Sequence, residues 1–422
     1  MANKPDTQVL IIGGGIGGLV LAAICRKVNI PCKVLERTRN LEPVGAGISL
    51  APNALKVLDQ LGLYEEIKRS GQPLKKILIH RNTTKWRELD FSDTERRFGY
   101  PVYSIERHHF HHMLYKAAGG EATVELDSKV EDIIDKSEEE YVKVKLADGR
   151  EFSAEVVVGA DGIRSITRRV LARNAGLEAT NTIRFTGRVH MSGYTAPMPN
   201  LGPEELGVAN WLFYDDSILT TWPCIDNRQW FIGVKMADPN SVQEKNRSVW
   251  SGTAREMIND VYGEKFHPFG ENGMVKDVVN RSERIIASNV YQEISFASMS
   301  SGRVALLGDA AHSMTSFFGQ GGCQAIEDAT ELANLLQRHF SVPAAERLSG
   351  VDDVLIEYSA RRQSRAKDIA TFSGNYAKLH TANLPYGMGP LVRKLVYAYM
   401  PVWMWMWYLE WLYGYQPVVD AL

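Results

Sequence analysis

The sequence has 422 residues, of which 45% are hydrophobic and 23% charged, a composition typical of a folded globular chain with two or three domains. Its formal net charge of −2 gives no electrostatic reason to bind nucleic acid, so a small molecule is the expected partner. The four cysteines lack the CxxC spacing of a zinc site, and their scatter favours a reducing, cytoplasmic compartment over a disulfide framework.

A strand, a glycine-rich turn and a helix open the chain. The apolar run at 8–12 predicts a strand, 17–28 predicts a helix, and CKVLE at 32–36 predicts a second strand. Together these segments form a βαβ unit. Too few apolar residues precede the glycines for a signal peptide, so we expect no secretion.

The turn in this unit has the spacing of a dinucleotide site. Gly13, Gly15 and Gly18 stand in GxGxxG register, and Glu36 closes the next predicted strand. Glycines allow a tight turn and close approach of the backbone, the helix N-terminus faces a pyrophosphate, and the carboxylate accepts ribose hydroxyls. An acid at that strand end favours FAD or NAD, and the loop alone does not choose between them.

The rest of the chain alternates between this domain and a second one. Residues 41–75 read as loop and helix, whereas KKILIH, ILTTWP and WFIGVKM read as short strands of an inserted, sheet-rich domain. A hairpin and a buried strand lead to Asp161, and the strand at 303–307 leads towards a helix starting near Gly322. The predicted boundaries are 1–75, 101–179 and 291–370 for the first domain, 76–100 and 180–290 for the second, and 371–422 for a C-terminal helical, aromatic-rich segment.

Two further motifs choose FAD. Asp161-Gly162 follows VVVGA, Gly308-Asp309 follows VALL, and with the first glycine loop this ordered triple resembles the class A flavoprotein monooxygenases, the para-hydroxybenzoate and salicylate hydroxylase superfamily. The resemblance covers roughly residues 7–370. PVGAGISLAPNALKVLDQLGL is similar to the salicylate and urate hydroxylase branches, and WLYGY resembles the ends of fungal enzymes that epoxidise prenylated natural products. The resemblance to the class A flavoprotein monooxygenases implies an α/β fold with a Rossmann-like FAD-binding domain (GR2-type) and an inserted β-sheet-rich substrate domain.

The resemblance also implies roles for individual residues. Asp309 bonds the ribityl chain, Glu36 the adenosine ribose, and Arg107 lies beside the ribityl-phosphate arm. Asp161 and its neighbouring glycine serve the pyrophosphate side and the engagement of NAD(P)H. The remaining candidate cofactor residues come from the glycine loops and their flanks: Gly13, Gly15, Ile16, Gly17, Gly18, Arg37, Gly47, Gly319, Gly321, Gly322 and Cys323.

The activity implied by the resemblance is that of an FAD-dependent monooxygenase. It consumes NAD(P)H and O2 and, through a flavin hydroperoxide, hydroxylates or epoxidises a small apolar aromatic or prenylated molecule, in secondary metabolism. Two alternatives stay open: a flavin-binding protein without oxygenase activity, and a flavin reductase or oxidase. The chain is expected to act as a monomer or homodimer.

The second glycine loop, GQGGC at 319–323, precedes a helix whose free N–H groups favour an anion. A reduced flavin is negative on its pyrimidine side, so this loop is expected to hold the isoalloxazine ring. Relatives carry proline and asparagine where this chain has Ser316 and Cys323. We interpret Cys323 as a subfamily feature and Ser316 as a tolerated change that retunes the site.

The catalytic base is not assigned by the sequence. Many relatives carry an arginine where Ser192 stands, and Arg188 or His190 could replace it, although a strand arginine facing solvent is the simpler interpretation of Arg188. Ser316 is a third candidate. An alkene epoxidase needs no base in the way that a phenol hydroxylase does.

Two features invite other interpretations. RHHFHHML places four histidines on one predicted helix, but no carboxylate or cysteine completes a ligand set, so we interpret it as a surface helix and expect no metal. The tryptophan-rich segment at 400–415 is too short for a spanning helix. Packing on the protein itself is favoured, including a cap over an apolar substrate, with peripheral membrane contact or a dimer contact as alternatives.

Overall fold

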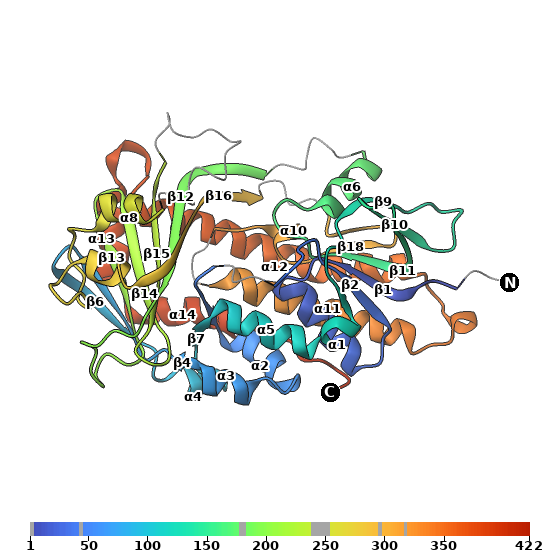
Figure 1. Ribbon diagram of the computed structural model, residues 1–422, viewed down its shortest axis with the longest axis horizontal. Coiled ribbons are helices and arrows are strands. Elements are labelled where there is room, and N and C mark those ends of the chain that lie inside the picture. The colour runs from blue at the N-terminus through green and yellow to red at the C-terminus, as the bar shows by residue number, and fades with distance from the viewer. Residues whose placement is uncertain (1–3, 42–44, 177–182, 238–253, 294–297, 316–318) are drawn as a thin grey trace.

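The computed structural model describes residues 4–41, 45–176, 183–237, 254–293, 298–315 and 319–422. Two large sheets lie at opposite ends of the molecule, and the long helix α12 (Val351–His380) runs between them (Figure 1). Both chain termini lie at the end that carries the first sheet. A cavity lies between the loops of the first sheet and one face of the second sheet.

The first sheet has a parallel centre in the order β8-β2-β1-β11-β18, with antiparallel β17 at one edge and β9 and β10 extending from β11. Its central strands are continuous apolar runs because helices cover both faces of a parallel sheet. This confirms the predicted Rossmann-like domain. The strands are β1 (Thr7–Ile12), β2 (Cys32–Leu35), β8 (Val124–Glu125), β9 (Val130–Ile134), β10 (Val142–Leu146), β11 (Glu151–Gly159), β17 (Ser300–Ser301) and β18 (Val304–Leu306).

Helices α1 and α11 pack against each other beside this sheet (Figure 1). A Cβ on Gly17 would lie 2.5 Å from Leu307 Cδ1 and 3.1 Å from Ala325 Cβ on α11, so glycine at this position favours the close approach of α11. The helix expected near Gly322 begins two residues earlier, at Gln320. The helices of this part are α1 (Ile16–Lys27), α2 (Pro52–Gln60), α3 (Tyr64–Ser70), α5 (Arg107–Ala117), α6 (Ile166–Asn174), α10 (Asp309–His312) and α11 (Gln320–Phe340).

The second sheet has seven strands in the order β16-β12-β15-β14-β13-β5-β6. Parallel pairing of β13 with β5 draws residues 76–90 into the same sheet as residues 183–293, and the three quoted strand motifs are β5, β14 and β15. The sheet-rich insertion is thereby confirmed. Its elements are β5 (Lys76–Arg81), β6 (Thr84–Asp90), α4 (Thr94–Phe98), β12 (Ile183–Thr195), β13 (Val208–Phe213), β14 (Ser217–Pro223), β15 (Gln229–Met236), α8 (Ala254–Tyr262), α9 (Val275–Val279) and β16 (Ser282–Glu293).

The segment 41–75 differs from the prediction of loop and helix alone. It also holds β3 (Gly47–Leu50) and β4 (Gly71–Pro73), which flank β7 (Tyr103–Glu106) in a small antiparallel sheet. Strands of three or four residues are too short to show a period of two, and their pairing depends on a partner far along the chain. The domain boundaries stay predictions. Strand β16 and helix α12 each run through one of them, at 290 and 370.

The C-terminal segment is helical and packs on the protein, as favoured from the sequence. It contains α13 (Gly389–Lys394), a π-helical turn (Leu395–Tyr399) and α14 (Val402–Tyr413). One face of α14 is buried through Trp405, Leu409 and Leu412, whereas Trp403 and Trp407 are about 70% exposed. Within the described residues, no helix has the length and apolar character needed to cross a bilayer.

Candidate active site

A cavity of about 470 Å³ lies between the motif loops of the first sheet and one face of the second sheet. Its volume falls within the range of small-molecule and cofactor sites. Several predicted site residues line it: Gly15, Ile16, Gly17, Gly47, Arg107, His190, Asp309, Gly319, Gly321 and Gly322. Gly13, Gly18, Glu36, Arg37, Asp161, Arg188 and Cys323 lie behind or beside this lining.

The first glycine loop divides its glycines between two tasks. Gly13 has φ of +108°, and a Cβ there would overlap the Ala160 carbonyl, so this glycine shapes the turn. A Cβ on Gly18 would overlap the carbonyl of Gly13. Gly15 is different, because the nearest atom to its Cβ would be 4.0 Å away and the residue lines the cavity. Gly15 therefore presents open backbone at the N-terminus of α1.

Glu36 holds the glycine loop in place. Its carboxylate accepts the Gly14 N–H at 2.7 Å and the Thr38 N–H at 2.9 Å. A carboxylate has about four acceptor sites, so further lone pairs are free for ribose hydroxyls. Arg37, next along the chain, is exposed.

Arg107 and Asp309 project into the cavity from opposite motifs. Both side chains keep accessible surface although protein surrounds them, because that surface faces the cavity. Burial raises the pKa of Asp309, opposed by His312 and Arg107, and burial lowers the pKa of Arg107, opposed by Asp309. The two groups thus place one acceptor and one cation inside a cavity that is otherwise poor in charge.

Asp161 acts locally on helix α6. Its Oδ2 accepts the Ile166 N–H at 2.8 Å and the Thr167 N–H at 3.1 Å, so the carboxylate caps that helix while Gly162 lines the cavity. The buried Arg168 was not singled out from the sequence. It donates to the carbonyls of Ile163 and Ala310, which ties the two motif loops together.

The N-terminus of α11 faces the cavity. Gly319 adopts φ of +66° before the helix begins, and the first-turn residues Gln320 to Gly322 line the cavity. The Cys323 thiol is buried and directed at the Ser49 carbonyl, and burial raises its pKa to about 12, so it is a neutral packing group. Ser316 lies outside the described residues.

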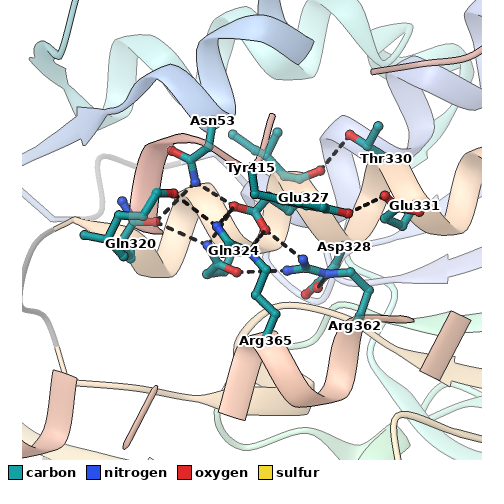
Figure 2. Close-up of polar contacts among 12 residues, drawn as sticks. Asn53, Gln320, Gln324, Glu327, Asp328, Thr330, Glu331, Arg362, Arg365 and Tyr415 are labelled. Carbon is teal, nitrogen blue, oxygen red and sulfur yellow. Dashed lines mark hydrogen bonds and ion pairs between the residues drawn. The ribbon is translucent and has the colours of Figure 1, made fainter. Parts of the chain in front are cut away.

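A buried polar network lies directly behind this turn (Figure 2). Gln320 accepts from Asn53, and Asn53 also donates to Glu327 at 2.7 Å. Arg362 is fully buried and pairs with Glu327 and with Asp328, each at 2.7 Å. The Gln320 amide nitrogen is buried with no hydrogen-bond partner among the described residues, so the network leaves the donors of this amide unsatisfied.

The same network reaches the C-terminal helix. Arg365 pairs with Glu327 at 2.8 Å and donates to the carbonyls of Trp411 and Leu412 at the end of α14. Tyr415 stacks under Arg365 and donates to Glu331. The helix that starts at the cavity is thereby fixed to the tryptophan-rich tail.

The roof of the cavity is one face of the second sheet. Its residues follow the alternation of strands, in which every second side chain points to the same face. Trp222 and Trp230 stack with ring centroids 5.5 Å apart, and a Cβ on Gly47 would overlap the Trp230 indole. The roof residues are His190, Ser192, Trp211, Ile218, Thr220, Trp222, Trp230, Ile232, Val234, Ile286 and Ser288.

The position of Arg188 corrects the interpretation from the sequence. Its side chain is only 5% exposed, so it does not face solvent, and it lies on the same strand face as His190 and Ser192. His190 lines the cavity, and its Nε2 is buried without a partner in the described part of the chain. Burial, reinforced by Arg107, lowers the pKa of His190 to about 4, so its imidazole is neutral at pH 7.

The histidine-rich helix α5 is not purely a surface helix. His111 is half-buried and hydrogen bonds the Gly14 carbonyl of the glycine loop at 2.7 Å, while His109 and His112 are exposed. Across the ranges that the structure describes, no cluster of three or more histidine, cysteine or acidic side chains is placed to hold a metal.

The residues present fit FAD. A cradle of close-packed glycines, a ribose-type carboxylate and a helix N-terminus line or support one cavity, as a dinucleotide requires. A protein-family profile described as FAD binding domain matches residues 6–373. The chain therefore belongs to this FAD-binding family.

Similar proteins define the activity. FAD-dependent monooxygenase pynG of Aspergillus niger is 52% identical over 427 residues, covering 98% of this chain and 97% of that protein. FAD-dependent monooxygenase pytG of Aspergillus terreus is 53% identical over 275 residues, covering 64% of this chain and 82% of that protein. The protein is an FAD-dependent monooxygenase.

Solved structures agree on the fold. HpxO of Klebsiella pneumoniae, complexed with FAD and uric acid, superposes with a TM-score of 0.80 at 21% identity over 97% of each chain. The salicylate hydroxylase substrate complex gives 0.72 at 24% identity over 98% of each chain.

Proposed function

We propose that the protein uses NAD(P)H and O2 to hydroxylate or epoxidise a small apolar aromatic or prenylated natural product in secondary metabolism. The observation that supports this proposal is the single cavity that joins the glycine loops to an apolar roof of tryptophan, isoleucine and valine side chains. The structure of HpxO contains uric acid, a flat ring system, and a flat aromatic substrate is what we propose for this protein. Bound FAD supplies the redox chemistry, and the chain supplies orientation and water exclusion.

We further propose how the chain holds FAD. Gly15, Ile16 and Gly17 offer backbone to the pyrophosphate, with Glu36 and Arg37 on the adenosine side. Asp309 and Arg107 contact the ribityl-phosphate arm, because they meet in the cavity between the two motif loops. The N-terminus of α11 lies against the pyrimidine, where its dipole and free N–H groups stabilise negative charge. Asp161 and Cys323 would contribute to FAD binding by fixing the position of the backbone around them, without a side-chain contact to FAD.

The proposal is tested by loading the purified protein with FAD and following NAD(P)H oxidation with a panel of phenols and prenylated aromatics under labelled O2. We expect substrate to accelerate NAD(P)H oxidation and the product to gain one labelled oxygen. NAD(P)H oxidation that yields only peroxide with every compound would support an oxidase instead. Bound FAD without stimulated turnover would support a flavin-binding protein.

His190 is the catalytic candidate that lines the cavity, and we propose that its neutral imidazole orients the substrate by a hydrogen bond. His190→Leu should raise KM by about five- to tenfold, the value of one hydrogen bond, with FAD content unchanged. His190→Gln should recover most of this loss, because an amide also donates and accepts. If Gln is as poor as Leu and the pH profile of kcat changes, His190 acts in proton transfer instead.

We also propose that the protein is cytoplasmic and makes peripheral contact with a membrane through its C-terminal segment. Trp403 and Trp407 are one helical turn apart, both about 70% exposed, and belong to a contiguous C-terminal segment of exposed apolar side chains. The others in that segment are Leu391, Leu395, Tyr399, Val402 and Met404.

We expect the protein to sediment with phosphatidylcholine vesicles and the double variant Trp403→Glu/Trp407→Glu to lose most of that binding. Ile356→Glu, at an exposed position on α12, is the control and should bind as the unchanged protein does. If the double variant instead lowers the molecular mass in solution and vesicles never bind, the surface is a dimer contact.

A further inference from the structure

A second, smaller cavity of about 180 Å³ lies beneath helix α14. Its interior is apolar, with Trp405, Met406 and Leu409 from α14 facing Leu74 and Ile77 beside the second sheet. The exposed carboxylates Glu88 and Asp90 also line it, which places its polar side at the surface near β6.

The two cavities share a wall. Ser49, Trp211 and Trp222 line both, so the small cavity begins where the roof of the large one ends. Trp211 and Trp222 contact each other with ring centroids 6.3 Å apart. The two cavities are therefore adjacent, with these two indoles between them.

The helix that covers the small cavity is held by polar contacts on several sides. Arg365 donates to the carbonyls of Trp411 and Leu412, and Arg87 donates to the carbonyls of Ala398 at 2.9 Å and Met400 at 2.5 Å. These contacts fix α14 at both ends without filling the space beneath it. The cavity is thus covered by a helix that is anchored at both ends.

The lining also indicates what the cavity would take. An apolar cavity of roughly 150 Å³ stays dry and binds benzene, so this volume suits a chain of about five or six carbons.

We propose that the cavity beneath α14 binds the apolar tail of the substrate, a prenyl or short alkyl chain, while the ring or alkene to be oxidised lies in the large cavity. This inference rests on the proposed function, because it assumes that the large cavity holds the reacting group. It makes the tryptophan-rich tail a determinant of substrate length.

Binding of para-alkylphenols with chains of one to eight carbons to the FAD-loaded protein, measured by calorimetry without NAD(P)H, tests the proposal. Affinity should rise about fourfold for each methylene up to five or six carbons and then level off. Met406→Trp fills the cavity and should abolish most of this rise. Met404→Trp places the same change on the outer side of the same helix and should leave it intact.

Leu409→Ala is a second test, because a loss of binding in Met406→Trp could also result from misfolding. It enlarges the cavity and should shift the plateau to longer chains, a gain that a damaged protein cannot show. No dependence on chain length in the unchanged protein, or an equal loss in Met404→Trp, would overturn the proposal. Because binding is measured without turnover, a normal chain-length series with no oxygen transfer would overturn the proposed function and leave this inference standing.

Discussion

Arg362→Leu should lower the free energy of unfolding by about 3–5 kcal/mol, because it removes one cationic partner from each of two buried carboxylates, Glu327 and Asp328. Arg362 is fully buried and bonds Asp328, Glu327 and Gln324 at 2.7, 2.7 and 2.9 Å. Gln324 donates in turn to Gln320 at the cavity. We therefore expect weaker FAD binding as well as lower stability.

The same substitution should change the response to acid. Although burial opposes ionisation, His312 and Arg362 hold the pKa of Asp328 well below its ordinary value of 3.8. Its stabilising contribution is thus present above that value and is lost as pH falls towards the depressed pKa. Without Arg362 the pKa of Asp328 rises, so acid unfolding should begin at higher pH.

Chemical denaturation of the unchanged protein and the variant at neutral pH and at decreasing pH measures both effects. Arg361→Leu is the matched control, since Arg361 is the preceding residue on α12 and, within the described part of the chain, its ion pairs are with exposed or partly exposed carboxylates, Glu357 and Glu331. Its loss should cost less than about 1 kcal/mol. Equal costs for the two variants would contradict a structural role for the buried network.

Gly13→Ala and Gly15→Ala should separate the fold from the cofactor site. At Gly13 the φ of +108° and the overlap with the Ala160 carbonyl both oppose a side chain, so the FAD-free protein should lose more than about 2 kcal/mol. At Gly15 the backbone is extended and the space is open, so the FAD-free stability should stay within about 0.5 kcal/mol. FAD affinity should nevertheless fall at least tenfold, because the new methyl group would stand where we propose that the pyrophosphate binds.

Thermal or chemical unfolding of the FAD-free protein measures the first effect, and titration with FAD measures the second. A Gly15→Ala protein that binds FAD as tightly as the unchanged protein would show that the pyrophosphate lies elsewhere. A Gly13→Ala protein of normal stability would contradict the steric argument for that turn.

Much of the architecture could be predicted from local patterns in the sequence. Strand β1, the glycine turn and α1 could be predicted because a buried parallel strand, a glycine-rich turn and an apolar helix in that order each leave a signal within a dozen residues. The inserted sheet was likewise visible in β5, β14 and β15. Strands β3 and β4 were not, since three or four residues acquire a strand conformation only through pairing with β7.

Some residues of the candidate site could also be predicted from the sequence, and others could not. Gly15, Asp309 and the α11 N-terminus could be found because their motifs sit at strand ends, where a parallel sheet gathers them. Arg168, Arg362 and Gln320 were not singled out, although the adjacent acidic pair Glu327-Asp328 in a helix with an apolar face was a usable signal. Arg362 bonds Asp328 34 residues away, Arg168 bonds Ala310 142 residues away, and Gln320 bonds Asn53 267 residues away, and no local pattern reports such partners.

By itself, the sequence determined the FAD-binding domain, its glycine turns and the inserted sheet, because backbone conformation and burial periodicity are local properties. Only the tertiary structure decided that Arg188 is buried, that Cys323 packs away from the cavity, and that one face of the tryptophan-rich helix closes a second apolar cavity. Each of these depends on which distant surface meets the side chain, and that is set by the packing of the two sheets around α12.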